Sequence, residues 1–253
     1  MPGDPFGLGG RVAVVTGAGS PRGIGFAAAS VLGGLGASLV VSGHSDRVHD
    51  RLAELPTGTA AVAGDLTRPE TAEDLVATAL SRFGRLDVVV HCAGMTSVAA
   101  PAPDGCTFDA WRAVLARDLD AAFLLAQAAL PVLKASGAGR LVVVASLTGP
   151  VMAMRGEVAY GAAKAGVVGL VRGLALAAAA DGVTVNAVAP GWIATGSQTA
   201  REHAQGLRTP LGRSGTAAEV AGLIAYLCTP SSSYVTGQCL VVDGGNSIAE
   251  ERA

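Results

Sequence analysis

Short apolar runs alternate with longer Ala- and Leu-rich stretches along the chain, and this alternation constrains the fold more than any other feature. Strands are predicted at 11–15, 38–42, 59–63, 86–91, 140–145, 183–189 and 238–242. Because these runs are apolar throughout rather than alternating in polarity, they are typical of a parallel sheet that is covered on both faces. The pattern therefore predicts an α/β fold with one doubly wound, seven-stranded parallel sheet flanked by helices, in a single domain over 1–253.

Helix-length stretches separate the predicted strands. Helices are expected at 24–35, 47–55, 69–83, 108–136, 157–180 and 216–228. The stretch at 108–136 is expected to break near Asp118. The segment 190–213 lacks clear periodicity, and a long irregular segment in a compact domain is usually a lid or a binding loop. We therefore expect the substrate loop there.

A glycine-rich turn follows the first predicted strand and opens the first predicted helix. Residues 16–25 read TGAGSPRGIG. Glycines let the backbone turn sharply and approach a pyrophosphate, and the N-terminus of the helix offers free N–H groups and a positive dipole end. The position between a strand and a helix favours dinucleotide binding, with a purely structural turn as the alternative.

The end of the second predicted strand bears on the choice between NAD and NADP. An acidic residue there would bind the adenosine ribose and repel a 2′-phosphate. Gly43 occupies that position, His44 follows it, and Arg22 lies in the glycine-rich turn. His44 and Arg22, with Arg47, would attract a phosphate, or they are solvated surface charges. Asp46 is an alternative acid, although it is more typical of a helix N-cap.

Polar or small residues follow the third, fourth and fifth predicted strands, at the edge where a doubly wound sheet binds ligands. Asp65 would accept a hydrogen bond from an adenine amino group or cap the next helix. His91 is expected to form structural hydrogen bonds rather than act as a catalytic base. Ala93 and Gly94 would let the backbone lie beside an adenosine ribose, and Ser146 would bind a substrate carbonyl.

Tyr160 and Lys164 suggest the chemistry of the site. The chain has three tyrosines and two lysines, and one of each lies four residues apart on a predicted helix, where such residues share a face. A phenol alone titrates near pH 10, too high for proton transfer at neutral pH. A neighbouring cation favours the phenolate, and lowering this pKa by ~3 units needs roughly 4 kcal/mol. The pair therefore indicates a tyrosine general acid or base.

Composition argues against several other functions. The net charge is −2 and no basic block is present, so nucleic-acid binding has little support. The N-terminal ten residues lack the apolar core of a signal peptide, and apolar runs such as 12–15 are too short to cross a membrane. The four cysteines lack metal-site spacing, so we expect reduced thiols, no metal and a cytoplasmic protein.

Together these residues resemble the short-chain dehydrogenase/reductase family, over roughly 10–246. The motifs that carry the resemblance are the glycine-rich turn, Asp65, Ala93-Gly94, Ser146, Tyr160 with Lys164, Asn186, the run PGWIAT at 190–195, and Asp243-Gly244-Gly245. No single motif is decisive, but the ordered set is specific. The run PLGR at 210–213 and the Asp-Gly-Gly ending are most similar to the branch that includes 3-oxoacyl reductases.

The resemblance implies a role for each site residue. Tyr160 would be the general acid in carbonyl reduction and the base in alcohol oxidation. Lys164 would lower the pKa of Tyr160 and bind the nicotinamide ribose, while Ser146 would orient the carbonyl oxygen. NADP(H) would be preferred, with NAD(H) as the alternative. The implied cofactor residues are Gly17, Ser20, Arg22, Gly23, Ile24, His44, Asp65, Leu66, Ala93, Gly94, Tyr160, Lys164, Pro190, Gly191, Ile193 and Thr195.

The chain departs from the family pattern in four places. Five residues separate Gly17 from Gly23, where three are usual. The interval from Ser146 to Tyr160 is one residue longer than is common. Residues 91–94 read HCAG instead of NNAG. Asp118 stands where the family has a catalytic asparagine that supports a water-linked proton relay; a carboxylate accepts hydrogen bonds but cannot donate as an amide does.

These expectations favour an NADPH-dependent carbonyl (keto) reductase, in which the cofactor gives hydride to a ketone and Tyr160 gives the proton. The alternatives are an NAD(P)-dependent alcohol dehydrogenase, a ketoreductase of a specialised biosynthetic pathway, and a cofactor-binding scaffold without catalysis. The expected partners are a small ketone or alcohol, and further copies of the chain in a homotetramer or homodimer formed by the two long helices. Neither nucleic acid nor membrane is expected.

Overall fold

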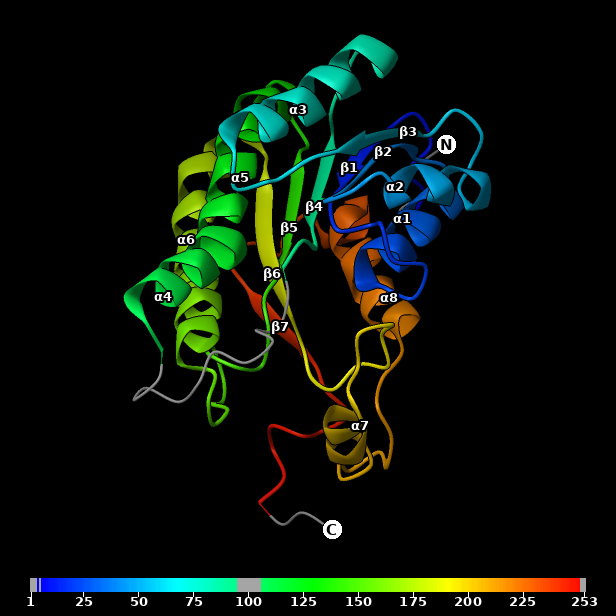
Figure 1. The fold of residues 1–253 in the computed structure, drawn as a ribbon. Helices are drawn as coiled ribbons and strands as arrows, with labels where there is room; N and C mark the ends of the chain where they lie inside the picture. Colours follow the sequence, from blue (N-terminus) through cyan, green and yellow to red (C-terminus); the bar gives the residue numbers. More distant parts are fainter. Residues whose placement is uncertain (1–3, 5, 95–105, 251–253) are drawn as a thin grey trace.

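The computed structural model of the chain describes residues 4, 6–94 and 106–250. One sheet forms the middle layer, with helices on both of its faces (Figure 1). Seven parallel strands lie in the order β3-β2-β1-β4-β5-β6-β7. The strands are β1 Val12–Val15, β2 Ser38–Gly43, β3 Ala60–Ala63, β4 Val88–His91, β5 Arg140–Val144, β6 Thr184–Pro190 and β7 Cys239–Val242. The predicted doubly wound, seven-stranded sheet is confirmed.

The strands form a central sheet because they are apolar on both sides, and helices bury both faces. Strands β1, β4, β5 and β6 are buried along their whole length. Helices α1 Ile24–Gly34, α2 Arg47–Asp50 and α8 Ala217–Cys228 contribute to the core on one face. Helices α3 Pro69–Phe83, α5 Ala121–Ala135 and α6 Val158–Ala178 contribute to the core on the other (Figure 1).

The long stretch at 108–136 is interrupted at the predicted place, but without a proline or glycine. Helix α4, Phe108–Leu115, passes through a π-helical turn, Ala116–Asp120, into α5. Turns of this kind are rare and are often found at functional sites. Asp118 lies in this turn and is only 1% exposed, so the distortion places a carboxylate inside the protein.

Two predicted segments differ in detail from the structure. The stretch at 47–55 is not one helix, because α2 ends at Asp50 and a 3₁₀ turn, Arg51–Glu54, follows. The segment 190–213 is not wholly irregular, because it contains the short helix α7, Ala200–Gly206. Thr199 and Glu202 form a capping box at the start of α7, which satisfies backbone N–H groups that a short helix would otherwise leave free.

Among the described residues, the stretch 158–181 is long and apolar enough to cross a membrane by length and composition alone. Only strand-length apolar runs were compared with the length of a membrane span above, so this stretch was not identified from the sequence. In the fold this stretch is α6 with the 3₁₀ turn Ala179–Asp181, and its Val167 and Val171 lie in the core that covers the sheet. Core helices of this kind pass the same test, so the expected lack of a membrane partner stays a prediction.

Candidate active site at the carboxyl ends of the strands

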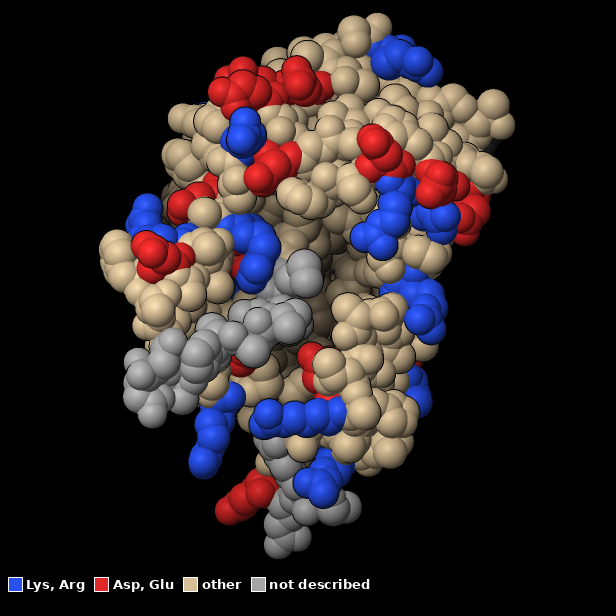
Figure 2. All heavy atoms as spheres, viewed as in Figure 1, with Lys and Arg blue, Asp and Glu red and all other residues tan. Residues whose placement is uncertain are grey.

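The site lies where the order of the strands reverses. The strands β1 and β4 are neighbours, but the sheet continues from β1 towards β2 and from β4 towards β5, which is the place where doubly wound sheets bind ligands. A cavity of about 880 Å³ opens there. On the face drawn in Figure 2 the molecule is hollowed between its two flanks, with basic and acidic side chains both present around the hollow. A cavity of this size accommodates a small-molecule ligand.

Glycines bring the glycine-rich turn against the end of β4. Gly17 has φ +71°, and a Cβ atom there would lie 2.9 Å from the backbone of Cys92 and Ala93. A Cβ atom on Gly25 would lie 2.5 Å from the carbonyl oxygen of Gly17. The N-cap of α1 is Gly23, which has no side chain to occupy the first N–H groups of the helix. The turn is therefore shaped to hold a pyrophosphate.

His91 supports the turn from inside the protein, in agreement with its expected structural role. Thr16 Oγ1 accepts the backbone N–H groups of Cys92 and Ala93 at 3.1 and 3.2 Å, and it lies 3.1 Å from His91 Nδ1. Because this oxygen already accepts twice, we assign the hydroxyl proton to the bond with Nδ1. Burial, helped by the charge of Lys164, lowers the pKa of His91 to about 3, so the ring is neutral.

Asp65 follows β3 and is held as an ionised acceptor. Its Oδ1 accepts the backbone N–H and the hydroxyl of Thr67 at 2.9 and 2.8 Å. These bonds, followed by the charges of His44 and Arg68, lower the pKa of Asp65. The alternative in which Asp65 caps the next helix is wrong. The N-cap of α3 is Arg68, and no side chain forms a capping hydrogen bond at the start of this helix.

The position of Gly43 leaves little space for an acidic side chain. A Cβ atom there would lie 3.1 Å from Val48 Cβ and 3.4 Å from Gly19 Cα. His44 is exposed, and its charge acts on Asp65. Arg22 is also exposed and lies close to the segment that follows β6, because a Cβ atom on Gly196 would be 3.7 Å from Arg22 Nε.

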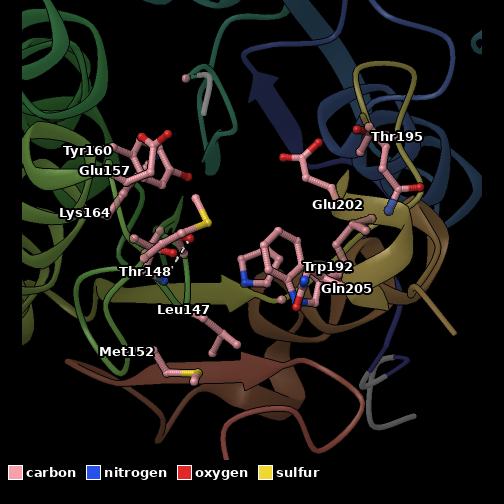
Figure 3. A pocket seen from close by; sticks show the side chains of 18 of the residues that line it. Leu147, Thr148, Met152, Glu157, Tyr160, Lys164, Trp192, Thr195, Glu202 and Gln205 are labelled. Carbon is pink, nitrogen blue, oxygen red and sulfur yellow. Dashed lines mark hydrogen bonds between the residues drawn. The ribbon is translucent and has the colours of Figure 1, made fainter. Parts of the chain in front are cut away.

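The residues of the proposed chemistry meet at one wall of the cavity. Tyr160 and Lys164 lie on the buried face of α6, with 6% and 4% of their surface exposed. Lys164 Nζ lies 5.6 Å from the centre of the Tyr160 ring. Ser146 follows β5, and its hydroxyl lowers the pKa of Tyr160. Figure 3 shows Tyr160 and Lys164 together with Glu157 on this wall, facing Glu202 and Trp192 across the cavity.

Lys164 is fixed between β5 and the π-helical turn. Its Nζ donates to the carbonyl oxygen of Val144 at 3.1 Å and lies 3.7 Å from Asp118 Oδ1. Asp118 Oδ2 accepts from Nε and Nη2 of Arg117 at 2.9 and 2.7 Å. Burial lowers the pKa of Lys164, and the attraction to Asp118 opposes that effect. The lysine, the carboxylate and the guanidinium thus form one connected group behind the tyrosine.

The electrostatic balance at Tyr160 differs from the expected one. Burial raises the pKa of Tyr160 to about 12, the hydrogen bond with Ser146 lowers it, and the charges of Asp118 and Glu157 raise it further. The expected net lowering of this pKa is therefore wrong: the charge of Arg117 lowers it, but burial outweighs that effect. At neutral pH the phenol keeps its proton, and this is the form that donates to a carbonyl oxygen.

Gly94 is needed by the charged group behind Tyr160. It has φ +146°, and a Cβ atom there would lie 2.7 Å from Asp118 Oδ1 and 3.1 Å from Lys164 Nζ. The sequence suggested a small residue here to accommodate an adenosine ribose. The structure adds a second reason, because the space of the missing side chain is filled by the Asp118–Lys164 pair.

We predict that Gly94→Ala lowers turnover by at least ~10-fold, because even a misplacement of 1 Å can cost ~10²-fold in rate. The added methyl group would displace the carboxylate or the ammonium group. Gly84→Ala is the matched control: Gly84 also has a positive φ, +75°, but a Cβ atom there meets nothing within 4 Å. Steady-state kinetics and thermal unfolding of both variants test this. Equal activity in the two variants would contradict the prediction.

The remaining walls of the cavity are formed by apolar side chains and by the loop that follows β5. Leu147, Met152 and Trp192 give apolar surface. A Cβ atom on Gly149, which has φ +105°, would collide with the carbonyl oxygen of Gly161, so the loop after β5 lies directly on α6. The backbone of this loop is thereby tied to the catalytic helix one residue after Tyr160.

Several polar lining residues were not identified from the sequence. Glu157 lies three residues before Tyr160, and Glu202, Gln205 and Arg201 come from α7, which the sequence analysis did not recognise. The expected cofactor residues divide into two groups. Those that line the cavity are Ile24, Gly94, Tyr160, Lys164, Pro190, Gly191, Ile193 and Thr195. Those outside it are Gly17, Ser20, Arg22, Gly23, His44, Asp65, Leu66 and Ala93.

Comparisons with known proteins agree with this arrangement. Residues 17–247 match the family model described as enoyl-(acyl carrier protein) reductase. A 3-oxoacyl-[acyl-carrier-protein] reductase of Synechocystis sp. is 37% identical over 243 residues, which cover 93% of this chain and 96% of the relative. A cis-4-hydroxycyclohexanecarboxylate dehydrogenase of Sinomonas cyclohexanicum is 39% identical over 242 residues, with 93% and 96% covered.

The fold is shared with solved structures. A crystal structure of a dehydrogenase/reductase from Sinorhizobium meliloti superposes with a TM-score of 0.89 and is 30% identical, with 97% of this chain and 98% of that chain covered. A tropinone reductase homolog of Arabidopsis thaliana is 36% identical over 252 residues, which cover 95% of this chain and 94% of that protein. Each of these proteins matches more than nine-tenths of the chain.

Proposed function

The chain belongs to the short-chain dehydrogenase/reductase family and is an NAD(P)-dependent oxidoreductase, and from this premise we propose that it is an NADPH-dependent carbonyl reductase. The observation that carries the proposal is the meeting of Ser146, Tyr160 and Lys164 at the wall of a cavity of about 880 Å³. The bound nicotinamide supplies the hydride. Tyr160 supplies the proton, and Ser146 holds the carbonyl oxygen of a small ketone.

The proposed cofactor site extends along the carboxyl ends of the strands. The glycine-rich turn, with Gly17, Ser20, Arg22, Gly23 and Ile24, holds the phosphates. The adenosine half lies against His44, Asp65, Leu66 and Ala93. Gly94, Lys164, Pro190, Gly191, Ile193 and Thr195 surround the nicotinamide half. The open turn at the N-terminus of α1 and the ionised Asp65 support this assignment, because both offer the polar groups that a dinucleotide needs.

The protonated form of Tyr160 is the form that carbonyl reduction needs. With a pKa of about 12 the residue is a proton donor at neutral pH, whereas alcohol oxidation needs the phenolate. The second candidate is an alcohol dehydrogenase, and a dehydrogenase relative at 39% identity favours it. Nicotinamide absorbance, followed with ketones and with alcohols across pH, separates the two. Cofactor binding without turnover in either direction would favour a scaffold instead.

We predict tighter binding of NADPH than of NADH. Gly43 presents no carboxylate to repel a 2′-phosphate, while Arg22 and His44 are exposed cationic or titratable groups near the proposed adenosine site. Hydrogen bonds to charged groups contribute about 1.5–3 kcal/mol, so Arg22→Ala should weaken NADPH about 10-fold or more and leave NADH nearly unchanged. Calorimetric titration of both cofactors measures this, with Arg82→Ala on α3 as a control. Equal weakening of both cofactors would contradict the assignment.

The proposed assembly is a homotetramer or homodimer formed by α5 and α6. Phe123 on α5 and Leu176 on α6 are 44% and 84% exposed, which supports a contact with another apolar surface. A cytoplasmic location also stays a prediction.

A further inference from the structure

We propose that Arg117 is a positioning residue for the Tyr160–Lys164 pair: it fixes the Asp118 carboxylate by one oxygen so that the other oxygen faces Lys164. The inference rests on the proposed proton transfer by Tyr160. It concerns a residue that acts on Tyr160 and Lys164 through its neighbour Asp118.

The geometry of the guanidinium group is specific. Nε and Nη2 of Arg117 both donate to Asp118 Oδ2, at 2.9 and 2.7 Å, and Oδ1 lies 3.7 Å from Lys164 Nζ. Consecutive residues on a regular α-helix do not face each other. Here the two belong to the π-helical turn Ala116–Asp120, in which their side chains meet. The turn and the arginine together set the orientation of the carboxylate.

Burial explains why the carboxylate needs this partner. The Asp118 side chain is fully buried, whereas 36% of the Arg117 side chain is exposed. A buried carboxylate without a charged or hydrogen-bonded partner is strongly disfavoured. Arg117 brings a positive charge to the carboxylate while part of its own side chain stays in water. The carboxylate thus lies between two cations, Arg117 and Lys164.

The charge of Arg117 also offsets the effect of Asp118 on Tyr160. Asp118 and Glu157 disfavour the Tyr160 phenolate, while Arg117 and the Ser146 hydroxyl favour it. At Lys164 the facing groups are Asp118, Arg117 and Cys92, and the neutral His91 lies near it. Without Arg117, the positive charge that opposes the effect of Asp118 on the tyrosine would be lost. The Tyr160 pKa would then rise.

A double-mutant cycle tests the inference. The wild type, Arg117→Gln, Asp118→Asn and the double variant are compared by pH–rate profiles of alcohol oxidation at fixed ionic strength. Asp118→Asn should lower the apparent pKa, because it removes a negative charge, and Arg117→Gln should raise it by about half a unit or more. If Arg117 acts through Asp118, its substitution shifts the apparent pKa less in the Asp118→Asn background. Arg117→Lys, which keeps the charge but not the planar fork, should give an intermediate shift.

Two results would overturn the inference. Equal shifts in both backgrounds would show that Arg117 acts only as a distant charge, and no shift at all would show that it has no part in the site. Arg112→Gln is the matched control, because Arg112 is an exposed arginine on the preceding helix α4. The Arg112→Gln variant should show the same apparent pKa for alcohol oxidation as the wild type.

Urea unfolding of the same four proteins without cofactor gives a readout that needs no turnover. Arg117→Gln should lower the unfolding midpoint, and the loss should be smaller in the Asp118→Asn background because the buried charge that Arg117 contacts is already removed. Equal losses would overturn the coupling of Arg117 to Asp118. The unfolding midpoints can also show that Arg117 and Asp118 are coupled while turnover does not depend on Tyr160. That result would overturn the proposed function, and the positioning role with it.

Discussion

Replacing Tyr160 by phenylalanine is expected to lower the turnover of ketones by at least ~10²-fold, the range typical of a lost general acid. The change removes the phenol oxygen that gives the proton and keeps the ring, which is almost completely buried against α4 and the π-helical turn. Fold and cofactor binding should therefore survive. Turnover is followed at the nicotinamide band, and cofactor affinity is measured by calorimetry.

Tyr226→Phe provides the control for this prediction. The substitution removes the same phenol hydroxyl, but from a tyrosine on α8 that is 37% exposed and does not line the cavity. Its substitution should leave turnover within about twofold of the wild type, as is usual for a surface change. If Tyr160→Phe were equally active, Tyr160 would not be the proton donor.

Replacing Lys164 by methionine is expected to damage turnover and cofactor binding together. Methionine has a similar length and leaves the core filled, but it removes the ammonium group beside the Tyr160 ring and its hydrogen bond to Val144. We expect turnover to fall by about 10²-fold. Cofactor affinity should fall by about 10-fold, since a hydrogen bond from a charged group contributes about 1.5–3 kcal/mol.

The chain contains a natural control for this substitution, because Lys134 is its other lysine. Lys134 bridges α5 to Asp181 at 2.9 Å and donates to the carbonyl oxygen of Ala177, outside the cavity. Lys134→Met should retain both turnover and cofactor affinity. An unchanged cofactor affinity in Lys164→Met, with turnover lost, would remove the proposed contact with the ribose and leave only the effect on Tyr160.

The sheet was predictable because its signal is local. Runs such as Val12–Val15 are apolar at every position, and such runs fit only strands buried on both faces. The interruption near Asp118 was also predicted, but its form was not. The residues of the turn Ala116–Asp120 include neither proline nor glycine, so no local signal in the sequence indicates a π-helical turn.

The residues that form the site were predictable from the sequence, but the pKa of Tyr160 was not. Ser146, Tyr160 and Lys164 come together because β5 ends and α6 begins at the same edge of the sheet. The pKa of Tyr160 depends mainly on burial, and the degree of burial follows from packing between distant segments. Helix α7 was missed although Thr199 and Glu202 carry the spacing of a capping box, because that signal is brief and the flanking segments are irregular.

The contact between Gly149 and the carbonyl of Gly161 separates substrate choice from chemistry. It is formed by main chain alone, so it does not depend on the side chains of the arc at 150–156, part of which lines the cavity. We therefore expect exchanges within that arc to change which substrates are accepted while Tyr160 keeps its place. The arc is therefore a suitable region for grafting a new specificity, whereas a side chain at position 149 would shift the catalytic helix itself.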